Sequence, residues 1–132
     1  MINFTTRALK IPFSFNVRID YKTFIDLDLN LHNQEYKCFP GVSPGWDNSS
    51  RRPVGKATIF EGSTPDKFKY WLSKKLQNFE PYSHEENFIM INAWNEWAEG
   101  NHLEPCKKWG LQFLEALNDE IFNYNKQKPS SI

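Results

Sequence analysis

The sequence predicts an α/β fold with a parallel sheet, and two observations support this prediction. Strand-like and helix-like segments alternate along the chain. Residues 88–91 form a continuous apolar run, which is typical of a strand covered on both faces. The chain has 132 residues, which suffice for one domain with its own core and are too few for two.

The N-terminal part is predicted to contain a strand, a helix and a second strand. Alternation indicates the first strand, with apolar positions at Ile11, Phe13, Phe15, Val17 and Ile19. Residues 20–31 give a mixed signal. Tyr21, Phe24 and Ile25 have helical spacing, whereas Leu27, Leu29 and Leu31 alternate as in a strand; we favour a helix. The apolar segment 37–42 predicts the second strand, and residues 43–53 form a loop rich in Pro, Gly, Asn and Ser.

A second loop, residues 55–62, is predicted to lead into a well-marked helix. Thr64 is a good N-cap, Pro65 suits the first helical position, and Asp66 favours the positive helix end. The apolar face of this helix consists of Phe68, Trp71, Leu72 and Leu76. After the strand at 88–91 we expect an amphipathic helix over about 108–124 and a polar tail, 125–132, that frays.

Composition argues against several function classes. Sixteen acidic and sixteen basic residues balance, so no net charge attracts nucleic acid or an anionic membrane. No segment approaches the ~18 consecutive apolar residues of a membrane span, and residues 1–7 do not resemble a secretory signal. Cys38 and Cys106 match no metal spacing, and we favour reduced thiols over a single disulfide. We therefore expect a cytoplasmic protein without a metal, a cofactor or a nucleic-acid partner.

Residues 91–105 form the most informative segment, because acids and indoles follow directly after the most apolar run. Glu96 and Glu99 share a face if the segment forms a turn or a helical start, and two such carboxyl groups can divide general acid and general base work on a glycosidic bond. Aromatic faces for a sugar ring and hydrogen-bonding groups for its hydroxyls are offered by Trp94, Trp97, Asn92, Asn95 and His102.

Each of these residues also has a simpler interpretation. The glutamates could solvate a loop, and the tryptophans could belong to the core. A metal-ligand role for His102 is disfavoured, because no second His or Cys lies at ligand spacing. Glu104 could pair with an arginine or contact a ligand.

A second group of candidate binding residues lies in the 43–53 loop, at Trp46, Asp47, Asn48, Arg51 and Arg52. Asp and Asn side chains can bind adjacent hydroxyls, and an arginine can clamp a carboxylate or phosphate. The alternative is an Asx-type turn beside surface arginines. Ligands of parallel α/β sheets gather beyond the carboxyl ends of the strands, where this loop and residues 92–105 are both expected.

Three blocks of sequence resemble the WbsX-type glycosyltransferases, which are associated with bacterial lipopolysaccharide and surface polysaccharide synthesis. They are residues 39–52, the helix start 64–68 and residues 91–105, in the family's order. The resemblance covers about residues 36–118 and extends to the related endo-α-mannosidases of glycoside hydrolase family 99.

The resemblance implies a (β/α)8 TIM-type barrel, with residues 36–124 as its C-terminal third, residues 1–35 less recognisable and 125–132 as the tail. It implies that Glu96 assists at the sugar 2-hydroxyl, favouring a 1,2-anhydro intermediate, and that Glu99 is the general acid/base. The substrate would be a glycan or an activated sugar. Two positions differ from the pattern: Ala98 stands where the hydrolases usually carry His, and Cys106 where the family commonly has Asp.

Length limits what this chain can form, because a full barrel needs about 200 residues or more. We therefore expect a fragment with exposed sheet edges, marginal stability and weak or no activity unless the missing N-terminal barrel portion is supplied. The alternatives are a retaining endo-α-mannosidase-like hydrolase, a non-catalytic carbohydrate-binding piece and a non-functional remnant.

Overall fold

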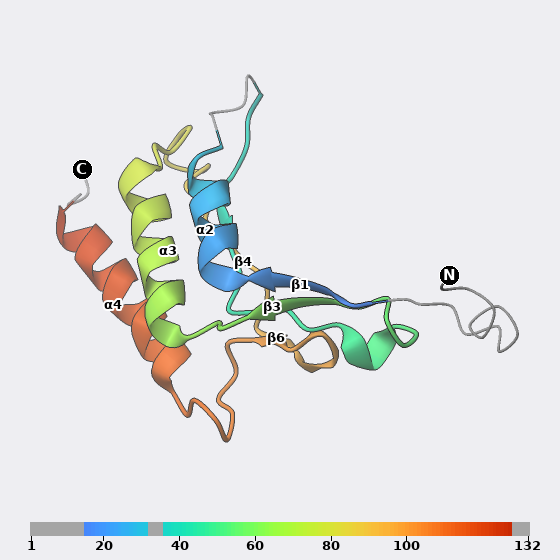
Figure 1. Ribbon diagram of the computed structural model, residues 1–132. Coiled ribbons are helices and arrows are strands. Elements are labelled where there is room, and N and C mark those ends of the chain that lie inside the picture. The colour runs from blue at the N-terminus through green and yellow to red at the C-terminus, as the bar shows by residue number, and fades with distance from the viewer. Residues whose placement is uncertain (1–14, 32–35, 128–132) are drawn as a thin grey trace, which may run out of the picture.

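The computed structural model describes residues 15–31 and 36–127, which form a mixed α/β arrangement (Figure 1). The helices are α2 (Tyr21–Leu29), α3 (Pro65–Asn78) and α4 (Gln112–Gln127), with short 3₁₀ helices η1 (Ser49–Arg51) and η2 (Trp97–Glu99). The strands are β1 (Val17–Asp20), β2 (Gly41–Val42), β3 (Thr58–Glu61), β4 (Met90–Ile91), β5 (Asn95–Glu96) and β6 (Asn101–His102).

The strands form three separate pairs. β2 and β4 are parallel neighbours, with Gly41 opposite Met90 and Val42 opposite Ile91, and α3 lies between them in the chain. β1 and β3 form a second parallel pair, and β5 and β6 an antiparallel one. The prediction of an α/β fold with parallel strands is therefore confirmed. Within the described residues the pairs do not join into one sheet.

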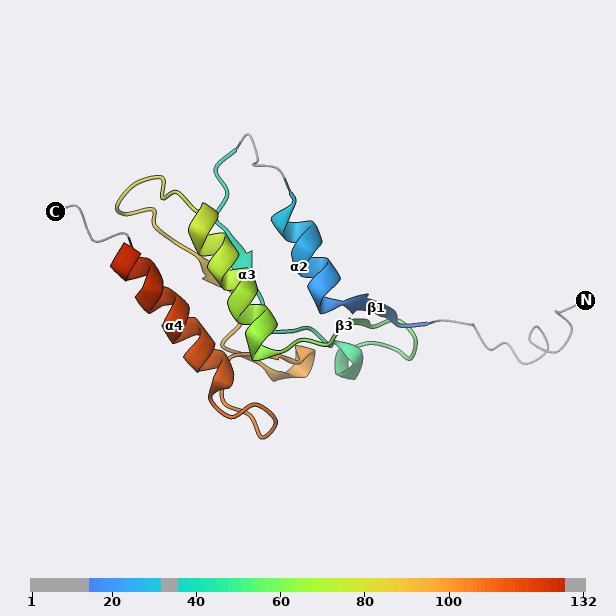
Figure 2. The same cartoon turned by 60° about the vertical axis from the view of Figure 1, so that its left-hand side comes forward.

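The three helices lie side by side, with α3 between α2 and α4, and the strands lie to one side of them (Figures 1 and 2). Between helices and strands is the buried core, made of Tyr21, Ile25, Val42, Phe68, Trp71, Leu72, Leu76, Leu103, Phe113 and Ala116. Asp28 joins α2 to α3, because its carboxylate accepts from Trp71 Nε1 and lies 2.7 Å from Lys75 Nζ. The predicted apolar face of α3 is thus confirmed as core.

The predicted start of α3 is present, and α2 begins at a cap that was not predicted. The Thr64 hydroxyl accepts from Lys67 N at 3.3 Å, and Pro65 begins α3. Asp20 caps α2 by accepting from Thr23 N at 2.7 Å, and the hydrogen bonds from Thr23 lower the pKa of this carboxyl group. The choice of helix over strand for residues 20–31 is confirmed.

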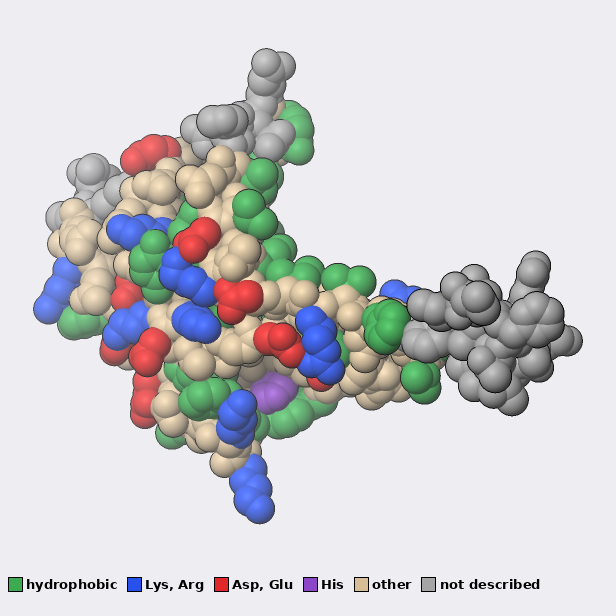
Figure 3. All heavy atoms as spheres, viewed as in Figure 1, with side chains coloured by type: hydrophobic (Ala, Val, Ile, Leu, Met, Phe, Trp, Pro, Cys, Tyr) green, Lys and Arg blue, Asp and Glu red, His purple; other side chains and the backbone are tan. Residues whose placement is uncertain are grey.

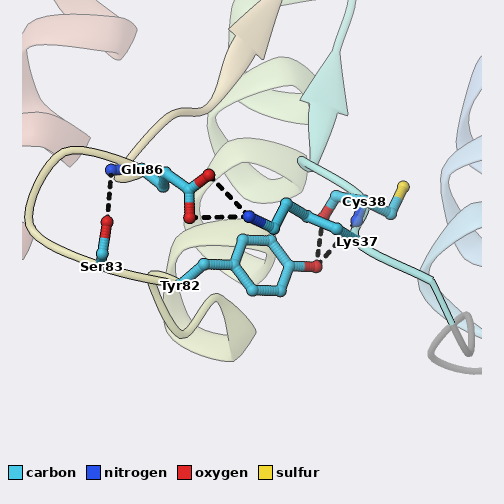
Figure 4. A network of polar contacts seen from close by, with 5 residues as sticks. All are labelled: Lys37, Cys38, Tyr82, Ser83 and Glu86. Atoms are coloured by element: carbon cyan, nitrogen blue, oxygen red, sulfur yellow. Dashed lines mark hydrogen bonds and ion pairs between the residues drawn. The ribbon is translucent and has the colours of Figure 1, made fainter.

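A polar network joins the segment before β2 to the loop before β4 (Figure 4). The Tyr82 hydroxyl accepts from Cys38 N at 2.8 Å and donates to Cys38 O at 3.0 Å. It thus satisfies both backbone groups of Cys38, which a neighbouring strand satisfies in a sheet. Lys37 Nζ lies 2.6 Å from the Glu86 carboxylate and over the Tyr82 ring. This network joins the segments that precede β2 and β4 in the chain.

Two sequence predictions are wrong. Residues 55–62 were expected to be a loop, but Thr58–Glu61 form β3, because pairing with β1 and contacts from the 43–53 loop stabilise an extended chain there. Residues 88–91 were expected to be covered on both faces, yet β4 has only two residues and Met90 is 53% exposed. Among the described residues only one strand, β2, pairs with β4, so its other edge and part of its surface stay open.

Other boundaries shift by a few residues. The second strand is shorter than the predicted 37–42, and α4 begins at Gln112 and continues to Gln127. Of the predicted first strand, Ile11 and Phe13 lie outside the described residues, as do residues 128–132 of the tail. Cys38 and Cys106 are free thiols, as expected. In the described ranges no helix is long and apolar enough to cross a bilayer.

Candidate functional site

The two candidate loops meet at one place. Each follows a strand of the parallel β2–β4 pair, so both leave the same end of that pair. Asp47 N donates to Glu99 O at 2.7 Å, and the Ser50 hydroxyl donates to Ala98 O at 2.5 Å. These bonds place η1 directly against η2, which brings the two groups of candidate residues together.

Glu96 and Glu99 both contact Arg51. Glu96 ends β5 and Glu99 ends η2, so the chain turns between them as a 3₁₀ helix. One guanidinium nitrogen, Arg51 Nη1, lies 3.3 Å from Glu96 Oε1 and 3.3 Å from Glu99 Oε1. The predicted turn is present, and a single cation is shared by the two carboxyl groups.

Gly100 makes the close approach of the loops possible. Its φ of +56° lies in the left-handed region that favours glycine, and it ends η2. A Cβ atom at this position would stand 3.2 Å from the Asp47 Cβ and 3.4 Å from the Asp47 N. A side chain here would therefore push the 43–53 loop away from Glu99.

Trp97, His102 and Glu104 form a second contact group. Trp97 Nε1 donates to Glu104 Oε2 at 2.6 Å, and the His102 ring stacks on the indole with the ring centroids 3.7 Å apart. His102 Nδ1 lies 3.0 Å from Glu104 O, and it must donate there because a carbonyl oxygen only accepts. The partner of Glu104 is thus an indole and not the arginine considered from the sequence.

The remaining aromatic and amide candidates lie at the surface of the site. Trp94 and Trp97 are 52% and 50% exposed, so neither is a core residue. Asn92 N donates to Val42 O at 3.0 Å, which extends the pairing of β4 with β2. The side chains of Asn92 and Asn95 are exposed and hydrogen-bond to no other described residue.

In the 43–53 loop, the side chains of two candidates, Asp47 and Asn48, form hydrogen bonds that stabilise the local fold. Asp47 Oδ1 accepts from Ser49 N at 2.9 Å, which is an Asx turn. Asn48 is buried, and its Oδ1 accepts from Thr58 N at 2.9 Å. Trp46 is partly buried, and its carbonyl oxygen accepts from Phe60 N at 2.7 Å. Asn48 thus positions β3, and sugar contacts of these three residues remain predictions.

Sequence reasoning missed three residues that support the loops. Tyr21 on α2 donates its hydroxyl to Ser43 O, and burial raises the pKa of this phenol, so it remains a donor at neutral pH. Ser43 Oγ lies 3.0 Å from Asn101 Oδ1. Asn101 is fully buried, and its Nδ2 has no hydrogen-bond partner among the described residues. The spacing of Tyr21, Phe24 and Ile25 predicted a helix, but it gave no indication that the Tyr21 hydroxyl contacts residue 43.

Within the described parts of the chain, no three His, Cys, Asp or Glu side chains are grouped so that they could hold a metal ion. The carboxyl groups of Glu96 and Glu99 instead face a guanidinium.

Replacing Arg51 with Gln tests how far the ion pairs hold the loops. Because all three side chains are partly exposed, we expect a loss of about 0–1 kcal/mol in unfolding free energy, measured by urea denaturation. Arg52→Gln is the matched control, since Arg52 is exposed and makes no ion pair with a described residue. A loss well above this range for Arg51→Gln would show that backbone contacts do not suffice to join η1 to η2.

The fold and the site define an α/β protein with a cluster of carboxyl groups and exposed indoles beyond two parallel strands. The family model described as "Glycosyltransferase WbsX" matches residues 2–117, and the chain belongs to this family. The match starts well before residue 36, where the resemblance in the sequence became recognisable.

The chain is also similar to two curated proteins. It is 42% identical over 91 residues to "Uncharacterized protein WxcX" of Xanthomonas campestris pv. campestris strain B100, and equally to the protein of that name from strain ATCC 33913. The alignment covers 67% of this chain and 13% of each relative, so the chain spans a small part of their length. No solved structure matches.

Proposed function

We propose that the chain is the C-terminal part of a carbohydrate-active (β/α)8 barrel that transfers sugars in bacterial surface polysaccharide or lipopolysaccharide synthesis. The observation that carries this proposal is the meeting of Glu96 and Glu99 at Arg51, beside half-exposed indoles, in a chain of the WbsX family. The β2–α3–β4 unit, with α2 and α4 on either side of α3, supports a barrel origin, because barrels repeat this unit.

We propose distinct roles for the two acids. Glu96 takes the proton of the sugar 2-hydroxyl, whose oxygen attacks the anomeric carbon to form a 1,2-anhydro sugar. Glu99 protonates the departing oxygen and then deprotonates the acceptor whose oxygen attacks the anomeric carbon; as the C1–O2 bond breaks, Glu96 returns its proton to the 2-oxygen. Arg51 contacts both carboxyl groups, and this shared contact supports their action on one sugar. An exposed Trp94 and a partly exposed His102 offer further contacts to a sugar.

Product analysis tests the reaction. The chain, together with a polypeptide that supplies the preceding barrel units, would be incubated with nucleotide-activated sugars and an oligosaccharide acceptor, and separately with α-mannan oligosaccharides. An extended acceptor, detected by mass spectrometry, is the expected product. Free reducing sugar would support the endo-α-mannosidase-like alternative instead. Glycan binding that survives Glu99→Gln, with no turnover under any condition, would support a non-catalytic binding piece.

We further propose that strands of a preceding barrel portion pair with the outer edges of β2 and β4. Within the described residues each of these strands pairs only with the other, and Phe88 and Met90 are exposed. In Figure 3, hydrophobic side chains are exposed along the inner angle where the strands leave the helices. Open edges and apolar surface of this kind are normally covered in a complete domain.

The partner proposal predicts that a polypeptide supplying the preceding barrel units of a longer WbsX relative stabilises this chain. We expect co-elution in gel filtration, a higher melting temperature and the appearance of turnover. Met90→Asp should weaken the association without unfolding the chain, because Met90 is already exposed. Leu111→Asp, at an exposed residue before α4, is the control. Equal association of both variants would contradict the proposal.

A further inference from the structure

The Trp97 indole is held from two directions. At its edge, Nε1 donates to Glu104 Oε2 at 2.6 Å, a short hydrogen bond to a carboxylate. On one face, the His102 ring stacks at 3.7 Å between centroids and 15° between planes. Even so, half of the Trp97 surface is exposed. One face of the indole is therefore covered while much of the side chain remains open to a ligand.

The two holding residues are themselves positioned by the local fold. β6 pairs with β5, with His102 opposite Asn95, so the backbone places His102 next to the turn that carries Trp97. His102 Nδ1 donates to Glu104 O, and Glu104 N donates to Trp94 O at 2.9 Å. The His102 ring is thus tied to backbone through Nδ1, and the Glu104 backbone is tied to that of Trp94. A side chain fixed in this way loses little rotamer entropy when a ligand binds.

The surrounding charge limits what such an indole can bind. Three carboxyl groups, those of Glu96, Glu99 and Glu104, lie around Trp97, and Arg51 contacts two of them. An added anion would meet this excess of acidic groups. The exposed indole face instead suits the C–H face of a pyranose ring, which is apolar and carries no charge.

We propose that His102 and Glu104 are positioning residues that present one face of Trp97 to a neutral pyranose, and that the site disfavours sugar acids. This inference rests on the proposed carbohydrate function and adds the class of sugar. Since His102 Nε2 and Glu104 Oε1 form no hydrogen bond with a described residue, they can also contact sugar hydroxyls, but both side chains serve mainly to orient the indole.

Indole ¹⁵N NMR of the full chain tests the proposal, with the Trp97 signal assigned through Trp97→Phe. The probes are methyl β-D-galactopyranoside, methyl β-D-glucopyranoside, methyl α-D-mannopyranoside and glucuronate. We expect at least one neutral glycoside to shift the Trp97 signal, and glucuronate to shift it less at equal concentration. A shift confined to Trp94, no Trp97 shift with any glycoside, or an equal response to glucuronate would overturn the proposal.

Matched variants separate positioning from simple support of the fold. His102→Phe keeps a stacking ring and Glu104→Gln keeps an acceptor oxygen, so both should retain the sugar-induced shift. His102→Ala and Glu104→Leu should lose it, and Glu104→Leu should also speed hydrogen exchange of the Trp97 indole N–H. Unchanged melting temperatures would show that the fold survives. Retention of the shift in His102→Ala would contradict the positioning role.

Failure of this inference differs from failure of the proposed function. If Trp97 responds to neutral sugars but no product forms even with the completing polypeptide, the indole site stands and the transferase proposal fails. If product forms while the Trp97 signal does not respond, the proposed function stands and the positioning inference fails.

Discussion

Glu99→Gln is expected to lower turnover by about 10²–10⁴-fold, because the amide cannot give a proton to the departing oxygen. The assay uses the chain together with the polypeptide that supplies the preceding barrel units. The loss should be smaller with glycosyl fluorides, whose leaving group needs no proton, than with oligosaccharide donors, whose alkoxide leaving group needs one. Equal losses with both kinds of donor would contradict the proposed acid role.

Glu96→Gln should lower turnover by a similar factor of about 10²–10⁴, but for a different reason. The proposed task of Glu96 is to remove the proton of the 2-hydroxyl. The corresponding 2-deoxy donor should therefore react slowly with the original chain, and Glu96→Gln should slow it little further.

The control for both glutamates is Glu85→Gln. Glu85 is exposed in the loop between α3 and β4, away from the contacts around Arg51. This variant should keep full turnover. If it loses as much activity as Glu99→Gln, the losses reflect damage to the fold and not the chemistry of the site.

Phe68→Ala is expected to give the largest loss of stability, about 3–5 kcal/mol in unfolding free energy. Phe68 is fully buried in α3, and its ring packs 5.6 Å from that of Phe113 on α4. Removing the ring leaves a cavity between the two helices and removes apolar burial. The measurement is urea denaturation followed by circular dichroism.

Phe122→Ala is the matched control for the core prediction. Phe122 also lies on α4 but is more than half exposed, and its only described ring contact is with Lys126. Its replacement should cost less than about 1 kcal/mol. Phe68→Ala should therefore unfold at a clearly lower urea concentration than Phe122→Ala.

The helices were predictable because their signals are local. Thr64 and Pro65 mark the start of α3 within the sequence itself, and Phe68, Trp71, Leu72 and Leu76 repeat at helical spacing. The start of α2 at Asp20 likewise depends on Thr23, three residues away. Such interactions act within a turn or two of chain, so the sequence pattern contains them.

The sheet was less predictable because strand pairing is not local. Residues 58–61 lie between Gly55 and Gly62 and were therefore predicted to be part of a loop. In the structure they pair with β1, about forty residues earlier in the chain. The run 88–91 suggested a fully covered strand, whereas coverage depends on neighbours that the described residues do not supply. Apolar composition by itself does not say which faces of a strand are covered.

The sequence by itself determined which residues are candidates for the chemistry, because the acids, indoles and amides of residues 92–105 follow a recognisable strand and lie in a family motif. It also determined the three helices. Only the tertiary structure decided how the candidates meet. Arg51 pairs with Glu96, which lies 45 positions away in the chain. The Asn48 side chain accepts a hydrogen bond from Thr58 N in β3, and the Glu104 carboxylate accepts one from the Trp97 indole. These outcomes depend on the parallel pairing of β2 with β4, which brings two distant loops to one end of the strands.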